Sequence, residues 1–120
     1  GAEPFEADIV VTGDRIAAVE PKTARQGRVE IDARGKIVTP GFVDLHTHTR
    51  EPGKLKAEDA ATASAAAAAG GYGVIHAMAN TAPVADTPES MVRTWQRGRE
   101  IGLVDIRPVG AVTIGLAGEQ

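Results

Sequence analysis

Residues 40–53 read Pro40-Gly41-Phe42-Val43-Asp44-Leu45-His46-Thr47-His48-Thr49-Arg50-Glu51-Pro52-Gly53. The segment begins as an apolar strand, carries polar side chains at every second position and ends in a Pro-Gly turn. Because strand side chains alternate between two faces, this spacing predicts that one face presents Asp44, His46, His48 and Arg50. An apolar back with this polar front is hard to explain by packing alone, so the segment is the first candidate for a functional site.

The two histidines have the spacing of a partial metal site. Imidazoles at positions i and i+2 lie roughly 6–7 Å apart along a strand that rises ~3.3 Å per residue. Both rings can therefore reach one metal ion, at nitrogen–metal distances near 2.0–2.1 Å. A catalytic zinc ion needs at least three protein ligands, so His46 and His48 alone do not complete such a site. Arg50 adds a planar fork that matches a carboxylate.

The same segment resembles the metal-binding motif of the amidohydrolase superfamily, in which His-x-His ends the first strand of a (β/α)8 barrel. Its continuation through Arg50-Glu51-Pro52-Gly53 is similar to the signature of class I-like dihydroorotases. Residues 70–86 resemble the next block of that family, with Ala79 where a proline is usual and Gly73 where a threonine is common. Residues 109–120 are similar to its third strand and loop.

This resemblance implies a set of roles. His46 and His48 would bind one or two zinc ions, and His48, Arg50 and Asn80 would contact the substrate. The implied reaction is the reversible, zinc-dependent conversion of N-carbamoyl-L-aspartate to L-dihydroorotate in de novo pyrimidine biosynthesis. The remaining zinc ligands and a proton-shuttling aspartate would come from later strands, so no catalytic residue is expected within this chain.

Two other functions stay open. Allantoinases and hydantoinases are cyclic amidases that share His-x-His, but they usually lack an arginine at the position of Arg50. A non-catalytic dihydroorotase-like subunit that supports aspartate transcarbamoylase is the second alternative, although such proteins lose metal ligands and this chain keeps two.

Each candidate residue also has a plain structural interpretation. Asp44 could orient an imidazole or be satisfied by the backbone. Arg50 could form a surface ion pair with Glu51, and Asn80 could be a turn residue. His76 lies in an apolar run, where a histidine that bonds to a neighbouring element is more common than a ligand.

The order of elements predicts an α/β protein. A hairpin is expected within residues 7–19, around Gly13-Asp14, with short extended stretches at 29–32 and 37–39. Helices are expected at 57–69 and 87–101, between strands at 40–50, 72–78 and 104–114. We therefore predict two parts: residues 1–39 as a β-strand segment of a composite β-sandwich, and residues 40–120 as the first strands and helices of the barrel.

Length and composition limit the function further. A (β/α)8 barrel takes about 250 residues, so a chain of 120 residues is expected to be an N-terminal portion that is inactive alone. A net charge of −3 without charge blocks gives no indication of nucleic acid or membrane binding. The absence of cysteine and of a signal-peptide pattern favours a cytoplasmic protein. The expected partners are a small-molecule substrate and either a second copy or aspartate transcarbamoylase.

Overall fold

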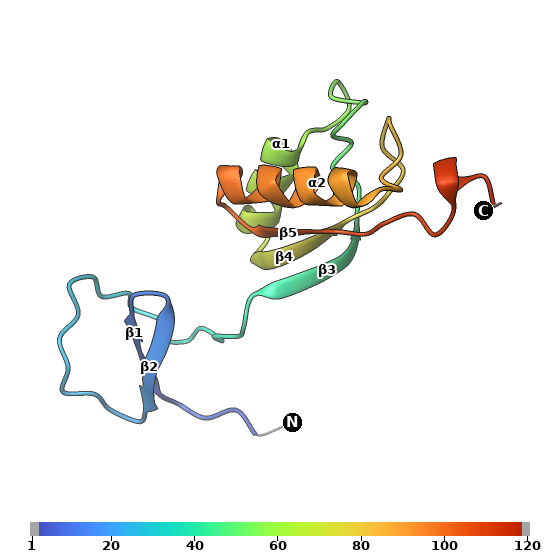
Figure 1. The fold of residues 1–120 in the computed structure, drawn as a ribbon. Helices are drawn as coiled ribbons and strands as arrows, with labels where there is room; N and C mark the ends of the chain where they lie inside the picture. Colours follow the sequence, from blue (N-terminus) through green and yellow to red (C-terminus); the bar gives the residue numbers. More distant parts are fainter. Residues whose placement is uncertain (1–2, 119–120) are drawn as a thin grey trace. The chain divides into compact units, whose positions relative to one another are not determined.

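The chain divides into two compact units, Gly1–Val38 and Thr39–Gln120, and the computed structural model describes residues 3–118. In the first unit, β1 (Asp8–Thr12) pairs antiparallel with β2 (Arg15–Glu20), which confirms the predicted hairpin (Figure 1). Gly13 makes this turn with a φ of 62°, a left-handed conformation that glycine adopts without steric cost.

The extended stretches predicted at 29–32 and 37–39 are not strands in the described part of the chain. Their side chains find no packing surface, since Ile31 is 84% and Ile37 is 92% exposed. The polar contacts between them are local: Asp32 binds Arg34, and Lys36 donates its N–H to the Ala33 carbonyl. Without a partner strand, the alternating pattern alone does not produce a β-ladder.

The second unit is a parallel three-stranded sheet with crossover helices. Its order is β3 (Phe42–Thr47), β4 (Tyr72–Ala77) and β5 (Asp105–Pro108). The connections contain α1 (Ala60–Ala69) and α2 (Pro88–Ile101), which lie together against one face of the sheet (Figure 1). We call the other face the open face. The predicted parallel α/β arrangement is confirmed, whereas these strands do not by themselves form a barrel.

Packing between the helices and the sheet sets which strand residues face which way. Ile75 and Ile106 are each 1% exposed and form the core with Ala77 and Val104. Burying a side chain of this size contributes about 1.5–3 kcal/mol. Because neighbours in a strand alternate, His76 on β4 and Arg107 on β5 belong to the open face, where they are register partners.

Both helices begin and end where their capping residues place them. The first helix begins at Ala60 rather than Ala57, because the Asp59 carboxylate accepts the Thr62 N–H at 2.8 Å and makes Asp59 the N-cap. The second helix has Thr87 as N-cap and stops at Gly102, whose φ is 70°, as predicted. Within residues 3–118, neither helix is long and apolar enough to cross a membrane.

The third strand is shorter than predicted. Pairing of β5 stops at Pro108, although Val109 still donates its N–H to the Ala77 carbonyl at 2.9 Å. The chain then leaves the sheet and forms a short 3-10 turn, η1 (Ile114–Leu116). Proline cannot donate to a ladder, which explains why regular pairing does not continue.

Candidate functional site

A bulge in β3 decides the direction of the candidate metal ligands. Asp44 is the register partner of Ile75, and Thr47 is the partner of Ala77. Three steps along β3 therefore match two along β4, so β3 holds one extra residue. Since Ile75 and Ala77 both face the helices, Asp44 and Thr47 align with the helix-facing side. The hydroxyl oxygen of Thr47 is buried, in agreement with this direction.

His46 and His48, which flank Thr47, consequently belong to the open face. Their rings lie close together, with centroids 5.2 Å apart and planes at 72°. The prediction that Asp44 shares their face is wrong, because simple alternation does not continue through the bulge. The bulge brings two imidazoles to the carboxyl end of β3, where a parallel sheet usually builds its ligand sites.

Asp44 forms its hydrogen bond with the backbone of His46 and not with an imidazole. Its carboxylate accepts the His46 N–H at 2.9 Å. This hydrogen bond from the backbone of His46 is the main reason why the pKa of Asp44 is lowered. The side chain thus fixes the bulged backbone that carries His46, which corresponds to the backbone-satisfied alternative for this residue.

Asn80 connects the loop after β4 to the second histidine. Its Oδ1 lies 2.8 Å from Nδ1 of His48. A carbonyl oxygen can only accept, so Nδ1 is the donor in this contact and Nε2 is left as the nitrogen for a metal. The Nδ2 group of Asn80 remains a donor for a second partner. Asn80 is therefore more than a turn residue.

Arg50 lies in the loop after β3 and not on the strand. The strand ends at Thr47, and Arg50 has a φ of 58°. The prediction that Arg50 continues the alternation of His46 and His48 is therefore wrong. The surface ion pair with Glu51 is also not formed among the described residues, because Glu51 pairs with Arg97, with Nε and Oε1 3.1 Å apart.

Backbone hydrogen bonds bring the loop of Arg50 against the loop of Asn80. Met78 donates its N–H to the Thr47 carbonyl at 2.9 Å, and Ala82 donates to the Pro52 carbonyl at 3.0 Å. Gly53 allows this approach, because a Cβ there would lie 2.6 Å from the Cβ of Ala82. Arg50 and Asn80, two of the candidate substrate-binding residues, thus come from adjoining loops at the same end of the sheet.

The loop of Asn80 closes without the proline that the related motif usually carries. The carbonyl of Ala79 accepts the N–H groups of Thr81 at 2.8 Å and of Ala85 at 3.0 Å. The loop after β5 joins it through Asp86, whose Oδ2 accepts the Gly115 N–H at 2.7 Å. This role of Asp86 was missed from the sequence, since only its place after a strand marks it.

His76 fits the structural interpretation given to it. It is partly buried, and its Nδ1 lies 3.2 Å from the Asp44 carbonyl on the neighbouring strand. Among residues 3–118 there is no group of three or more histidine, cysteine or acidic side chains that could hold a metal ion. The donor set of His46 and His48 suits zinc but is incomplete.

Comparison with known proteins identifies the family. A family model described as "Dihydro-orotase-like" matches residues 35–120. The chain belongs to the dihydro-orotase-like family. It is 51% identical over 125 residues to the dihydroorotase of Mycobacterium tuberculosis, a match that covers 100% of this chain and 29% of that protein. Dihydroorotases of Streptomyces coelicolor and Bacillus subtilis are 46% and 45% identical, and 28% of each is covered. The chain thus spans less than a third of the length of these relatives.

Proposed function

We propose that this chain forms the first part of the active site of a zinc-dependent dihydroorotase. The complete protein would interconvert N-carbamoyl-L-aspartate and L-dihydroorotate in pyrimidine biosynthesis. The observation that carries the proposal is the contact between His48 and Asn80, which joins the carboxyl ends of two neighbouring strands beside His46. The dihydroorotases that share 40–51% identity with the chain support it.

In this proposal, the residues of this chain bind the zinc ion and orient the substrate. His46 and His48 would hold zinc, with Asn80 fixing the tautomer of His48. Bound zinc would supply Lewis-acid polarisation of a cyclic amide carbonyl. The guanidinium of Arg50 and the free Nδ2 group of Asn80 would hold the substrate carboxylate, and His48 would border the substrate as well. The proton shuttle and the remaining ligands would come from sequence beyond this chain, so the chain alone would be inactive.

The proposal extends to the architecture. Residues 1–39 would contribute strands to a composite β-sandwich, and residues 40–120 would supply the first strands and helices of a (β/α)8 barrel. Exposed edges on β3 and β5 agree with a sheet that continues. Self-association, a complex with aspartate transcarbamoylase and a cytoplasmic location remain predictions.

The decisive experiment is a substrate comparison in the complete protein. Turnover of dihydroorotate, with little or none of allantoin and dihydrouracil, is expected if a carboxylate is recognised. Preference for allantoin or dihydrouracil would instead identify another cyclic amidase, and absence of turnover would favour the non-catalytic subunit.

Arg50→Lys tests the carboxylate contact within the same protein. Lysine keeps the charge but loses the bidentate fork, so kcat/KM for dihydroorotate should fall roughly ten- to a hundredfold, as expected for about 1.5–3 kcal/mol of charged hydrogen bonding. Zinc content should stay at the wild-type level, because Arg50 is not a ligand. An unchanged kcat/KM would remove Arg50 from the substrate site.

A further inference from the structure

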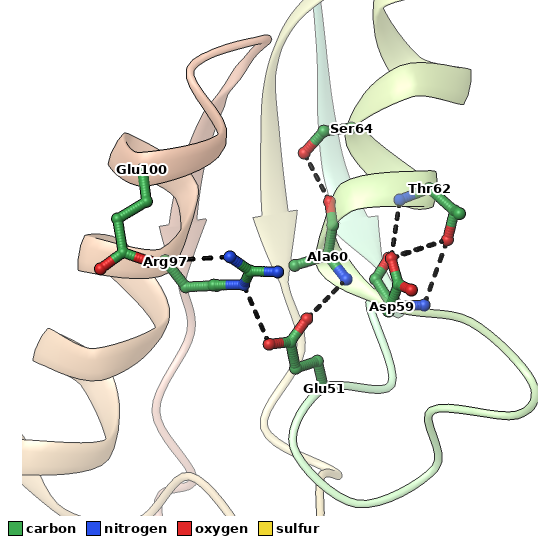
Figure 2. Close-up of polar contacts among 7 residues, drawn as sticks. All are labelled: Glu51, Asp59, Ala60, Thr62, Ser64, Arg97 and Glu100. Carbon is green, nitrogen blue, oxygen red and sulfur yellow. Dashed lines mark hydrogen bonds and ion pairs between the residues drawn. The ribbon is translucent and has the colours of Figure 1, made fainter.

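Glu51 connects the loop of Arg50 to both helices. Its Oε2 accepts the N–H of Ala60, the first residue of α1, at 2.9 Å, and its Oε1 accepts the Nε–H of Arg97 on α2 at 3.1 Å (Figure 2). The Glu51 side chain is only 24% exposed. Both oxygens of one carboxylate are therefore used, and their partners lie on two separate elements.

The amino end of α1 explains why a carboxylate suits this position. The first N–H groups of a helix have no partner within the helix and form the positive end of its dipole. Asp59 accepts the Thr62 N–H, as Figure 2 shows, and Glu51 accepts the Ala60 N–H from outside the helix. Ala60 is 3% exposed, so water is a poor substitute for this acceptor.

Arg97 is held on two sides. Besides Glu51, it pairs with Glu100 one turn further along α2, with Nη1 and Oε2 3.6 Å apart (Figure 2). The Glu100 side chain is 69% exposed, and its ion-pair partner in this cluster, Arg97, lies on the same helix. Glu51 is thus the member of the cluster that transmits the position of the helices to the loop.

Arg50, the residue before Glu51, has a backbone that needs such support. Its φ of 58° lies in the left-handed region, which residues other than glycine rarely adopt. A conformation of this kind persists where the surroundings determine it. On one side, the Arg50 carbonyl accepts the Lys54 N–H at 2.9 Å. On the other side, the next side chain is the Glu51 carboxylate, fixed between two helices.

We propose that Glu51 is a positioning residue for Arg50. By binding the Ala60 N–H and Arg97, it holds the loop in the one conformation that presents the Arg50 guanidinium to a substrate carboxylate. This inference rests on the proposed function, because it takes Arg50 as the carboxylate-binding group. A preorganised loop binds more tightly because it loses less freedom on binding.

The test compares Glu51→Gln with Glu100→Gln in the complete protein. Glutamine keeps the shape of Glu51 but loses its charge. Its amide NH2 group would also face one of the two N–H donors, those of Ala60 and Arg97, that the carboxylate accepts from. Glu100→Gln removes a carboxylate from the same arginine but leaves the partners of both Glu51 hydrogen bonds in place. Glu51→Gln should raise KM for dihydroorotate on the order of tenfold and change kcat little. The reason is that the substrate carboxylate does not react, so Arg50 binds it equally well in the ground state and in the transition state. Glu100→Gln should leave both constants unchanged.

A second arm separates positioning from general stability. In an Arg50→Lys background, Glu51→Gln should cause almost no further rise in KM, because its effect acts through Arg50. If Glu51 only stabilised the fold, the effects of Glu51→Gln and Arg50→Lys on KM would multiply, and Glu51→Gln would also lower zinc content. Arg97→Gln, which leaves Glu51 bonded to Ala60, is a milder variant that should raise KM in the same direction.

Amide hydrogen exchange supplies a readout that is independent of activity. Exchange across residues 48–57 should be faster in Glu51→Gln than in Glu100→Gln. Equal exchange in the two variants, an unchanged KM, or full additivity with Arg50→Lys would overturn the inference. If the wild-type protein does not turn over dihydroorotate, the proposed function fails by itself, and the exchange comparison still decides whether Glu51 holds the loop.

Discussion

At the scale of single residues, the hydrogen bond between His48 and Asn80 determines which imidazole nitrogen is available. Because Asn80 Oδ1 accepts a hydrogen bond from Nδ1–H, Nε2 is the nitrogen of His48 that is left for a metal on the open face. His46 lies beside it, with its backbone fixed by Asp44. Two adjacent imidazoles at the carboxyl end of β3 are a good start for a zinc site, and they lead to a direct prediction.

In the complete protein, His46→Ala or His48→Ala should lower zinc content and turnover together, because each removes one of a small number of ligands. Metal analysis of the purified variants, together with rates on dihydroorotate, checks this. His76→Gln is the matched control, since His76 contacts a backbone carbonyl. It should keep its zinc. If either alanine variant retains both zinc and turnover, that histidine is not a ligand.

Strand alternation was sufficient to predict that His46 and His48 share a face, and the family resemblance implied that His48 and Asn80 belong to one site. Alternation was not sufficient for Asp44 and Arg50, since a bulge and a left-handed residue interrupt the alternation on which their direction was predicted. The partners of Glu51 lie 9 and 46 residues away, and no local pattern encodes such contacts.

At the scale of elements, Gly98 sets how closely α2 approaches β5. A Cβ at this position would lie 2.7 Å from the Cβ of Ile106, which is 1% exposed. The capping residues of α2 were predictable because they act locally. This close approach was not predictable, since it depends on a strand that follows the helix and folds back beneath it.

Gly98→Ala should therefore destabilise the complete protein by about 1–3 kcal/mol, the usual cost of overpacking. The predicted change is opposite in sign to the effect of helix propensity alone, which favours alanine over glycine by ~1 kcal/mol. The measurement is a denaturant or thermal unfolding curve. Gln96→Ala, at an exposed position of the same helix, should change stability little. A Gly98→Ala variant that is as stable as the wild type would show that α2 can move away from β5 at no cost.

The start of α1 gives a prediction about pH. Hydrogen bonds from the backbone and side chain of Thr62 lower the pKa of Asp59 in the folded protein. A lowered pKa means that the ionised cap stabilises the fold above the unfolded pKa of about 3.9, and that this contribution is lost as pH falls through the folded pKa. Asp59→Asn keeps an acceptor but cannot titrate. The advantage of the wild type over this variant in melting temperature should shrink between about pH 6 and about pH 3. A constant difference across that range would contradict the role of ionisation.

At the scale of the whole molecule, the sheet has two open edges. Among the described residues, β3 and β5 each pair only with β4. Strand β3 also exposes large apolar side chains, with Phe42 54%, Val43 51% and Leu45 71% exposed. Unpaired edges and apolar patches of this kind promote association between chains. The parallel order of the strands followed from the sequence, while closure of the sheet into a barrel would need more strands than the three that residues 3–118 contribute to it.

The 120-residue chain expressed alone should consequently self-associate, melt without a sharp transition and show no turnover of dihydroorotate. Leu45→Lys should shift it toward the monomer in size-exclusion chromatography, because a charge on an edge strand opposes edge-to-edge pairing. Ile37→Lys is the matched control. Ile37 is 92% exposed but lies outside the sheet, so this change should leave the elution profile as it was. Neither variant should restore turnover, since His46 and His48 remain an incomplete ligand set. A monomeric wild-type chain with a cooperative melt would mean that three strands and two helices are stable without the rest of the sheet.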